Sequence, residues 1–350
     1  MNGRERFFAY LEGREVDRIP NLSTIKAIAA KLAGVPYGKY CTDYRYMVRA
    51  YMSCCEKFGI DITGVMSDPF REAYDFGMDI EFREDDMPRS KGPLIPEKGD
   101  IGKLRPYDPY KAKRAVNTCN AIRLFKETAG DRLVIYGIVE MPFSEATMLR
   151  GMQNAMLDLY EDPGFVIKMM DIILETMKEY AVAQIKAGAD VVGFGDAPAS
   201  LVSPDTYREF ILPYEKELIK TVHEHGAYAR LHICGNINHL LKDMANTGAD
   251  IIDIDWMVDV KKATEIFKDR IFISGNLDPV SVYLQGTPGL VMSKVRELAG
   301  INHRTLFISS GCEIPKASPV ENIIAHDRAL RESGSPSSIS RLSSQAGDRQ

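Results

Sequence analysis

"GFVIKMMDIILETMKEYAVAQIKAGADVVGFGDA", residues 164–197, joins a helical pattern to a strand pattern. From 164 to 189 the apolar residues recur at helical spacing, and the closing "AGA" is typical of a helix that ends at a glycine. Residues 190–197 are a short apolar run with two β-branched residues, which predicts a buried strand ending near Asp196. The stretch is therefore one helix-then-strand unit.

The same alternation of short apolar runs and longer helical patterns continues along the whole chain. The predicted strands are 18–25, 61–68, 133–140, 190–197, 227–235, 251–256, 271–279 and 305–312. Eight strands separated by helices predict an α/β fold of the (β/α)8 TIM barrel type, with helical insertions at 26–60 and 69–132 after the first two strands. A doubly wound open sheet is the alternative, but no G-x-G-x-x-G follows the first strand.

The composition and charge indicate which classes of binding partner to expect. The 350 residues are 45% hydrophobic and 27% charged with a net charge of −5, which is typical of a soluble globular protein. No Lys/Arg-rich run and no apolar run of about 18 residues occur, so neither nucleic acid nor a membrane is an expected partner. We expect one barrel domain over residues 1–332 and a disordered, Ser-rich tail over 333–350.

The cysteines indicate a reducing compartment. Six cysteines are spread thinly along a chain whose charged N-terminus lacks the apolar run of a signal peptide. We therefore expect a cytoplasmic protein whose thiols are free for packing or for metal binding.

Polar residues gather where the predicted strands end, and barrel enzymes place their chemistry at the carboxyl ends of the strands. Capping of the following helices is the alternative, most plainly for Asp278 before Pro279. The candidate catalytic residues at these ends are Glu140, Asp196, Asp255 and Asn276.

His232 and Cys234, in "ARLHICGN" (229–236), differ by two and so lie on one face of a strand. Cys312 ends the last predicted strand, which we expect to face them across the barrel mouth. One imidazole and two thiolates suit Zn²⁺ with an open fourth position, which Asp255 could fill. Alone, each Cys is more often a small buried hydrophobe, and H-x-C is a weak signal. Two thiolates weaken the metal as a Lewis acid toward water and favour activation of an incoming thiol.

Five segments carry a resemblance to the uroporphyrinogen decarboxylase superfamily, whose fold is a (β/α)8 barrel. They are "RERFFAYLEGREVDRIPN" (4–21), "DAPASLVSPDTYREFILPYEKELI" (196–219), "IIDIDWMVDV" (251–260), "ISGNLDPVSVYLQGTPGLVMSKVREL" (273–298) and "GCEIPKASPVENIIAHDRAL" (311–330). The true decarboxylases carry an arginine-rich segment after the first strand, with a catalytic aspartate, and a histidine in place of Cys312. This chain has "PNLSTIKAIAAKLAG" (20–34) there, so it is more similar to the cobalamin-dependent zinc methyltransferase branch.

In that branch His232, Cys234 and Cys312 match the zinc-binding motif. The resemblance implies methyl transfer from a methylated corrinoid protein, which carries the cobalamin, to a thiol such as coenzyme M. Demethylation of a methoxy compound or methylamine, and transfer linked to tetrahydrofolate, remain open. We expect the pocket for the donor or acceptor at 66–88 and 137–152. A zinc-dependent decarboxylase or lyase of a small acid, using Asp196, Asp253 and Glu140, and a non-enzymatic binding protein are further alternatives, and the sequence leaves homodimerisation open.

Overall fold

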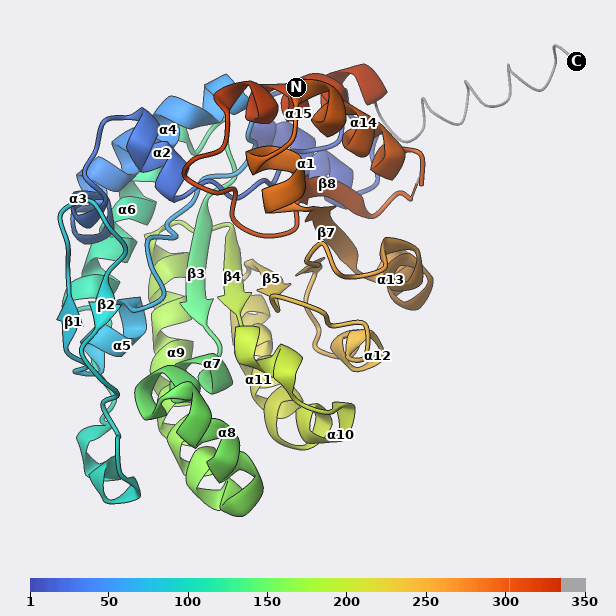
Figure 1. The fold of residues 1–350 in the computed structure, drawn as a ribbon. Coiled ribbons are helices and arrows are strands. Elements are labelled where there is room, and N and C mark those ends of the chain that lie inside the picture. Colours follow the sequence, from blue (N-terminus) through green and yellow to red (C-terminus); the bar gives the residue numbers. More distant parts are fainter. Residues whose placement is uncertain (302, 335–350) are drawn as a thin grey trace, which may run out of the picture.

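Six parallel strands form the centre of the molecule. In the computed structural model, which describes residues 1–301 and 303–334, they pair in the order β3-β4-β5-β6-β7-β8 (Figure 1). Their bounds are Tyr136–Glu140 (β3), Val191–Gly195 (β4), Tyr228–His232 (β5), Ile251–Asp253 (β6), Phe272–Leu277 (β7) and Leu306–Ser310 (β8). All six lie inside predicted strands, and the α/β barrel class is confirmed.

The first two predicted strands are extended segments without a regular ladder. In 61–68 only Ile62 pairs, in a parallel bridge with Val134. Segment 18–25 contains Pro20, which has no N–H to donate. It is nevertheless held on both sides, since Asp61 N donates to Asn21 O at 3.1 Å and Ile314 N donates to Thr24 O at 3.1 Å. The two segments thus occupy the positions between β8 and β3.

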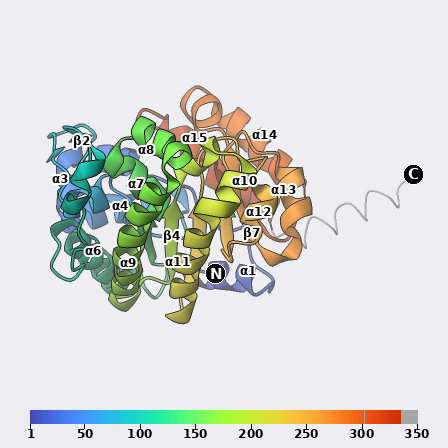
Figure 2. The same cartoon turned by 90° about the horizontal axis from the view of Figure 1, so that it is seen from below.

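Helices surround the strands, as the view from below shows (Figure 2). The helices that follow β3 to β8 or precede them are α6 (Lys113–Ala129), α7 (Pro142–Arg150), α8 (Met152–Glu161), α9 (Pro163–Ala187), α10 (Pro204–Thr206), α11 (Leu212–Glu224), α12 (Leu241–Met244), α13 (Val260–Phe267), α14 (Pro288–Ala299) and α15 (Val320–Ser333). Short 3-10 or π turns occur at Lys98–Lys103, Ala197–Leu201, Tyr207–Ile211, Lys268–Arg270 and Pro279–Leu284. α9 ends at Gly188 in the left-handed conformation, as the "AGA" pattern predicts.

The predicted insertions are present. α1 (Gly3–Leu11) begins the chain, α2 (Ala27–Leu32), α3 (Tyr37–Thr42) and α4 (Tyr44–Phe58) lie in the first insertion, and α5 (Arg71–Asp75), β1 (Ile80–Glu81) and β2 (Arg89–Ser90) lie in the second. β1 and β2 form a small antiparallel pair beside the barrel (Figure 1). The predicted tail lies, from residue 335 on, outside the described residues and stays a prediction.

Candidate metal and active site

A nitrogen and two sulfur atoms converge at the barrel mouth. β5 ends at His232, and Cys234 follows it on the same side, while Cys312 comes two residues after β8. Nε2 of His232 lies 2.9 Å from Sγ of Cys234, which lies 4.0 Å from Sγ of Cys312. The three ligand atoms all lie within 4.8 Å of one another. The topology therefore brings together residues separated by up to 80 positions in the sequence.

Contacts within the cluster also shift the pKa values of its three groups. The contact with Cys312 lowers the pKa of Cys234, and the same contact, together with burial, raises the pKa of Cys312. Burial opposes protonation of His232, but its interaction with Cys312 and the nearby carboxylates of Asp253 and Asp255 raise its pKa. These shifts make Cys234 the more acidic of the two thiols, and binding of a metal ion would displace the remaining protons from all three groups.

The donor set fits Zn²⁺. Nδ1 of His232 is buried and has no hydrogen-bond partner among the described residues, while Nε2 faces Sγ of Cys234. Two sulfurs and one nitrogen are the ligand types that zinc prefers, and three protein ligands leave a position for substrate. Within residues 1–301 and 303–334, this is the one group of three His, Cys, Asp or Glu residues with converging ligand atoms.

Asp255 lies beside the cluster and is not part of the converging group. Its two carboxylate oxygens accept hydrogen bonds from the backbone N–H of Gly235 at 2.8 Å and of Trp256 at 2.7 Å. Gly235 has a φ of +88°, a conformation that favours glycine, so the bond to Asp255 fixes a tight turn directly after Cys234. The structure thus shows Asp255 holding the turn, and its role as fourth ligand stays a prediction.

Asn276 of β7 contacts the loop that contains Asp255. Its Nδ2 donates to Val258 O at 2.8 Å and to Asp255 O at 3.3 Å, so it ties down the loop after β6. It does not line the cavity described below. Its geometry is that of a positioning residue.

Asp196 is fully buried behind the mouth. It lies beside Glu215 of α11, and burial together with the charge of Glu215 raises its pKa well above the usual range. Burial also raises the pKa of Glu215 to about 7, and Tyr207 donates a hydrogen bond to the Glu215 carboxylate. Asp196 does not line the cavity either, so of the four candidate catalytic residues only Glu140 does.

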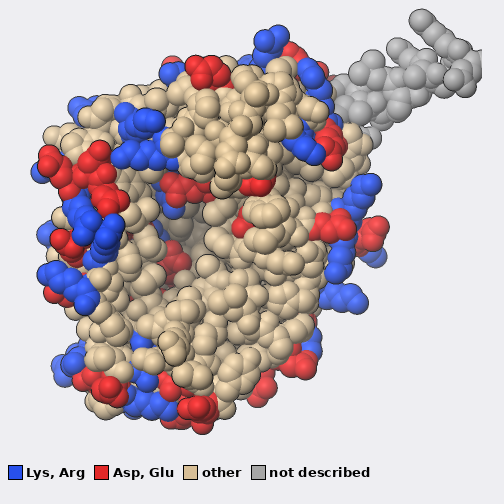
Figure 3. Space-filling view, viewed as in Figure 1, with Lys and Arg blue, Asp and Glu red and all other residues tan. Residues whose placement is uncertain are grey.

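A cavity of about 320 Å³ opens beside the metal-ligand cluster. Figure 3 shows it as a hollow in the face that contains the strand ends, within a largely uncharged surface. The predicted pocket regions contribute to it through Met66, Arg71, Met87, Ile138 and Glu140. Glu140 accepts hydrogen bonds from Arg71 Nη2 and from Ser144 Oγ, both at 3.2 Å.

Sequence reasoning missed four charged residues of this cavity. Lys26, Asp68, Arg71 and Arg230 line it, and the signal that could have found Lys26, Asp68 and Arg71 is their place at or directly after the segments that end at the mouth. Arg230 belongs to β5 itself, two residues before His232, so the alternation of the strand points it to the same side.

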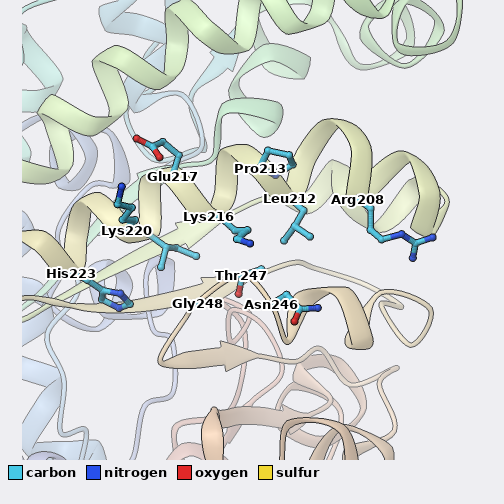
Figure 4. Close-up of a pocket in the computed structure, with 11 residues that line it drawn as sticks. Arg208, Leu212, Pro213, Lys216, Glu217, Lys220, His223, Asn246, Thr247 and Gly248 are labelled. Carbon is cyan, nitrogen blue, oxygen red and sulfur yellow. The ribbon is translucent and has the colours of Figure 1, made fainter.

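A larger hollow of about 580 Å³ lies elsewhere, on the outer wall (Figure 4). α11 contributes Lys216 and Lys220 to it, and the 246–248 turn forms the other side. It is a shallow groove between a helix and a loop, away from the strand ends. Because no metal-ligand group converges there, we place the chemistry in the smaller cavity.

The family described as uroporphyrinogen decarboxylase (URO-D) matches residues 2–333. The chain belongs to this family. One relative, a uroporphyrinogen decarboxylase of Chlorobaculum parvum, is 31% identical over 277 residues, which are 73% of this chain and 76% of that protein. The methylcobamide:CoM methyltransferase MtbA of Methanosarcina acetivorans is 28% identical over 329 residues, or 91% of this chain and 95% of that protein.

A solved structure of a methyltransferase from Methanosarcina mazei agrees with the second comparison. It superposes with a TM-score of 0.86 at 25% identity and covers 95% of this chain and 99% of its own. These likenesses confirm the predicted methyltransferase class within the URO-D family. A B12-independent methionine synthase from Shewanella, at a TM-score of 0.56 and 13% identity, shares the fold. In the part of the chain that is described, no helix is long and apolar enough to cross a bilayer.

Proposed function

We propose that this protein transfers a methyl group from a methylated corrinoid, carried by a partner protein, to a small thiol. The observation that supports this most is the convergence of His232, Cys234 and Cys312 beside the cavity. The relatives named methylcobamide:CoM methyltransferase match over nearly their whole length. Zn²⁺ held by the three residues would lower the pKa of the incoming thiol and keep its sulfur nucleophilic at neutral pH.

The reaction is a displacement at the methyl carbon. The thiolate sulfur forms the new C–S bond as the Co–C bond breaks, and the pair of electrons from that bond stays on cobalt, which changes from Co(III) to Co(I). The thiol proton leaves to solvent. The protein's part is to hold sulfur and methyl carbon in line, which replaces a bimolecular encounter by an oriented one. The braced turn of Cys234 and Gly235 serves this orientation.

Cavity size decides how the corrinoid approaches. A volume of about 320 Å³ suits a small thiol and a methyl group but not a corrin macrocycle. The ring would therefore lie over the mouth. Exposed apolar side chains follow the carboxyl ends of β4, β6 and β7, namely Leu201, Trp256, Met257 and Val280. Exposed aromatic and apolar groups of this kind are typical of a protein-binding rim, which supports a partner that delivers the corrinoid.

The decarboxylase relatives favour a second candidate, a decarboxylase of an acidic substrate. A porphyrinogen would need free cations for its carboxylates and much more volume than the cavity offers. The cavity instead presents thiols at the strand ends, and its cations already have carboxylate partners.

A spectrum tests the proposal. The protein, with its zinc content measured, is mixed with methylcobalamin under anaerobic conditions and with a thiol in excess. We expect the visible spectrum of methylcobalamin to change to that of cob(I)alamin, with one methyl thioether formed for each corrinoid consumed. No change with coenzyme M, homocysteine, 2-mercaptoethanol or tetrahydrofolate would contradict the proposal and favour the decarboxylase or lyase.

A further inference from the structure

We infer that the thiol accepted by this cavity carries no net charge apart from its sulfur, unlike the sulfonate coenzyme M named for the relatives. The inference rests on the proposed function and deepens it by naming the class of acceptor. The observation that carries it is the pairing of every cation in the cavity wall. The pairs are Lys26–Glu313 at 2.9 Å, Arg71–Glu140 at 3.2 Å and Arg230–Asp253 at 2.8 Å.

The carboxylate of Glu313 is fixed beside Lys26. Its Oε1 accepts a hydrogen bond from the backbone N–H of Ala27 at 3.2 Å while Oε2 faces the Lys26 amine. An anionic ligand at Lys26 would have to share the amine, in competition with a carboxylate that the backbone holds in place. Such competition costs much of the gain from the new ion pair.

The two arginines are still less available. Both oxygens of Asp253 contact Arg230 Nε, at 2.9 and 2.8 Å, and Arg230 Nη2 donates to Leu22 O at 3.3 Å. The Arg230 guanidinium also lies 5.5 Å from the centre of the Tyr136 ring, which holds it against the barrel interior.

Arg71 faces two carboxylates, Glu140 at 3.2 Å and Glu72 at 3.5 Å, and donates to Asp68 O. Both guanidinium groups therefore already face carboxylates, and Nε of Arg71 is the buried donor that has no hydrogen-bond partner among the described residues.

The total charge of the lining leads to the same conclusion. The wall contains three cations and four carboxylates, and the fourth carboxylate, Asp68, pairs with Arg114 behind the wall. Zn²⁺ and the two thiolates would cancel each other. A sulfonate would thus add an uncompensated anion to a half-enclosed site, whereas an uncharged or zwitterionic thiol would not.

Two thiols of equal chain length test the inference. 2-Mercaptoethanol and 2-mercaptoethanesulfonate are titrated by calorimetry into the zinc-loaded protein. We expect the sulfonate to bind about tenfold more weakly, or weaker still. Tighter binding of the sulfonate, or binding of neither thiol, would overturn the inference.

Methylation of the same two thiols is measured beside their binding. The two measurements together separate the inference about the acceptor class from the proposed methyl transfer. Faster methylation of the sulfonate would overturn the acceptor class and leave the methyltransferase standing. Absence of methylation together with preferred binding of 2-mercaptoethanol would overturn the methyltransferase and leave the charge preference standing.

A substitution in the pair next to the cluster sharpens the test. Glu313→Gln keeps the size of the side chain and an oxygen for Ala27 N–H but removes the charge that faces Lys26. We expect the ratio of sulfonate affinity to 2-mercaptoethanol affinity to rise about tenfold. Glu297→Gln is the matched control, because it removes the partner of Lys294 in an exposed pair at 2.7 Å.

An equal ratio of the two affinities in Glu313→Gln and in the control would overturn the inference. If Glu313→Gln loses its zinc or fails to fold, Glu140→Gln makes the same test at Arg71. In that variant Glu72 is the one carboxylate side chain left within 4 Å of the Arg71 guanidinium among the described residues.

Discussion

Polar side chains gather at both the base and the mouth of the barrel. The two regions differ in how many of these side chains have hydrogen-bond or ionic partners within the protein. At the base, the buried carboxylate of Asp61 faces Arg6 Nη1 at 2.6 Å and Arg18 Nη1 at 2.8 Å, and it accepts the N–H of Asn21 at 2.7 Å. At the mouth, Nδ1 of His232 has no partner in the described chain, and two thiols lie in contact.

The difference separates stability from function. The contacts of Asp61 at the base fix α1 and segment 18–25 to the second extended segment, 61–68. Each of these ion pairs and hydrogen bonds restricts the movement of the side chains that take part in the others. The mouth cluster leaves lone pairs and protons without protein partners, which costs stability and keeps them free for a metal ion and substrate. Substitutions at the base should therefore change stability, and substitutions at the mouth should change metal binding and turnover.

Cys312→Ser should have the largest effect. Serine removes one of two thiolate ligands, so we expect zinc content to fall and methyl transfer to drop more than about 100-fold, while the thermal midpoint changes little. Metal analysis and the cob(I)alamin assay measure the two effects. Cys119→Ser, at a buried thiol of α6 away from the mouth, is the control that should keep its zinc. Full zinc content in Cys312→Ser would remove Cys312 from the site.

Asp61→Asn should be the largest change in stability. It leaves Arg6 and Arg18 buried opposite a neutral amide, and loss of one partner from a buried ionic network costs about 3–5 kcal/mol of the free energy of unfolding. Urea denaturation measures this loss. The folded fraction should keep its zinc per molecule, and loss of zinc from that fraction would break the separation between base and mouth.

The parts of the fold that the sequence predicted are those that repeat a simple period. β3 to β8 and α9 come from apolar runs and 3.6-residue spacing, which report burial directly. Segment 18–25 failed as a regular strand because its neighbours meet it through single backbone bonds, which no periodicity encodes. His232, Cys234 and Cys312 were predictable because strand order places strand ends together.

The orientation of side chains at the mouth was not predictable. Asp196 follows β4 just as Glu140 ends β3, yet Asp196 turns into the interior beside Glu215 while Glu140 lines the cavity. The direction of the chain after a strand end depends on the turn and on which helix packs over it. The cavity's ion pairs likewise join residues far apart in sequence, such as Lys26 and Glu313.

The buried pair of Asp196 and Glu215 adds a pH test. Burial raises the pKa of Glu215 from 4.5 to about 7, so the folded chain keeps a proton that the unfolded chain has lost. The free energy of unfolding should therefore fall as pH rises from about 4.5 through about 7. Glu215→Gln removes one titrating group and keeps an acceptor for Tyr207, so its decline should be smaller by about 1–3 kcal/mol. Urea titrations at pH 5 and pH 8 measure the difference, and equal declines in both proteins would contradict it.

Asp255→Asn should have the smallest effect of these substitutions. It tests whether Asp255 positions the Cys234 turn or binds the metal ion itself. The amide keeps one acceptor oxygen but places an NH2 group against the N–H of either Gly235 or Trp256, so the turn after Cys234 loosens while all three predicted ligands remain. Loss of one orienting contact behind a ligand typically weakens metal binding about 10- to 100-fold. Competition with a chromophoric zinc chelator measures this change. Asp259→Asn is a suitable control, because Asp259 caps α13 on the same loop without contacting the Cys234 turn. If the zinc affinity of Asp255→Asn fell as far as that of Cys312→Ser, Asp255 would be acting as a ligand and not as a brace.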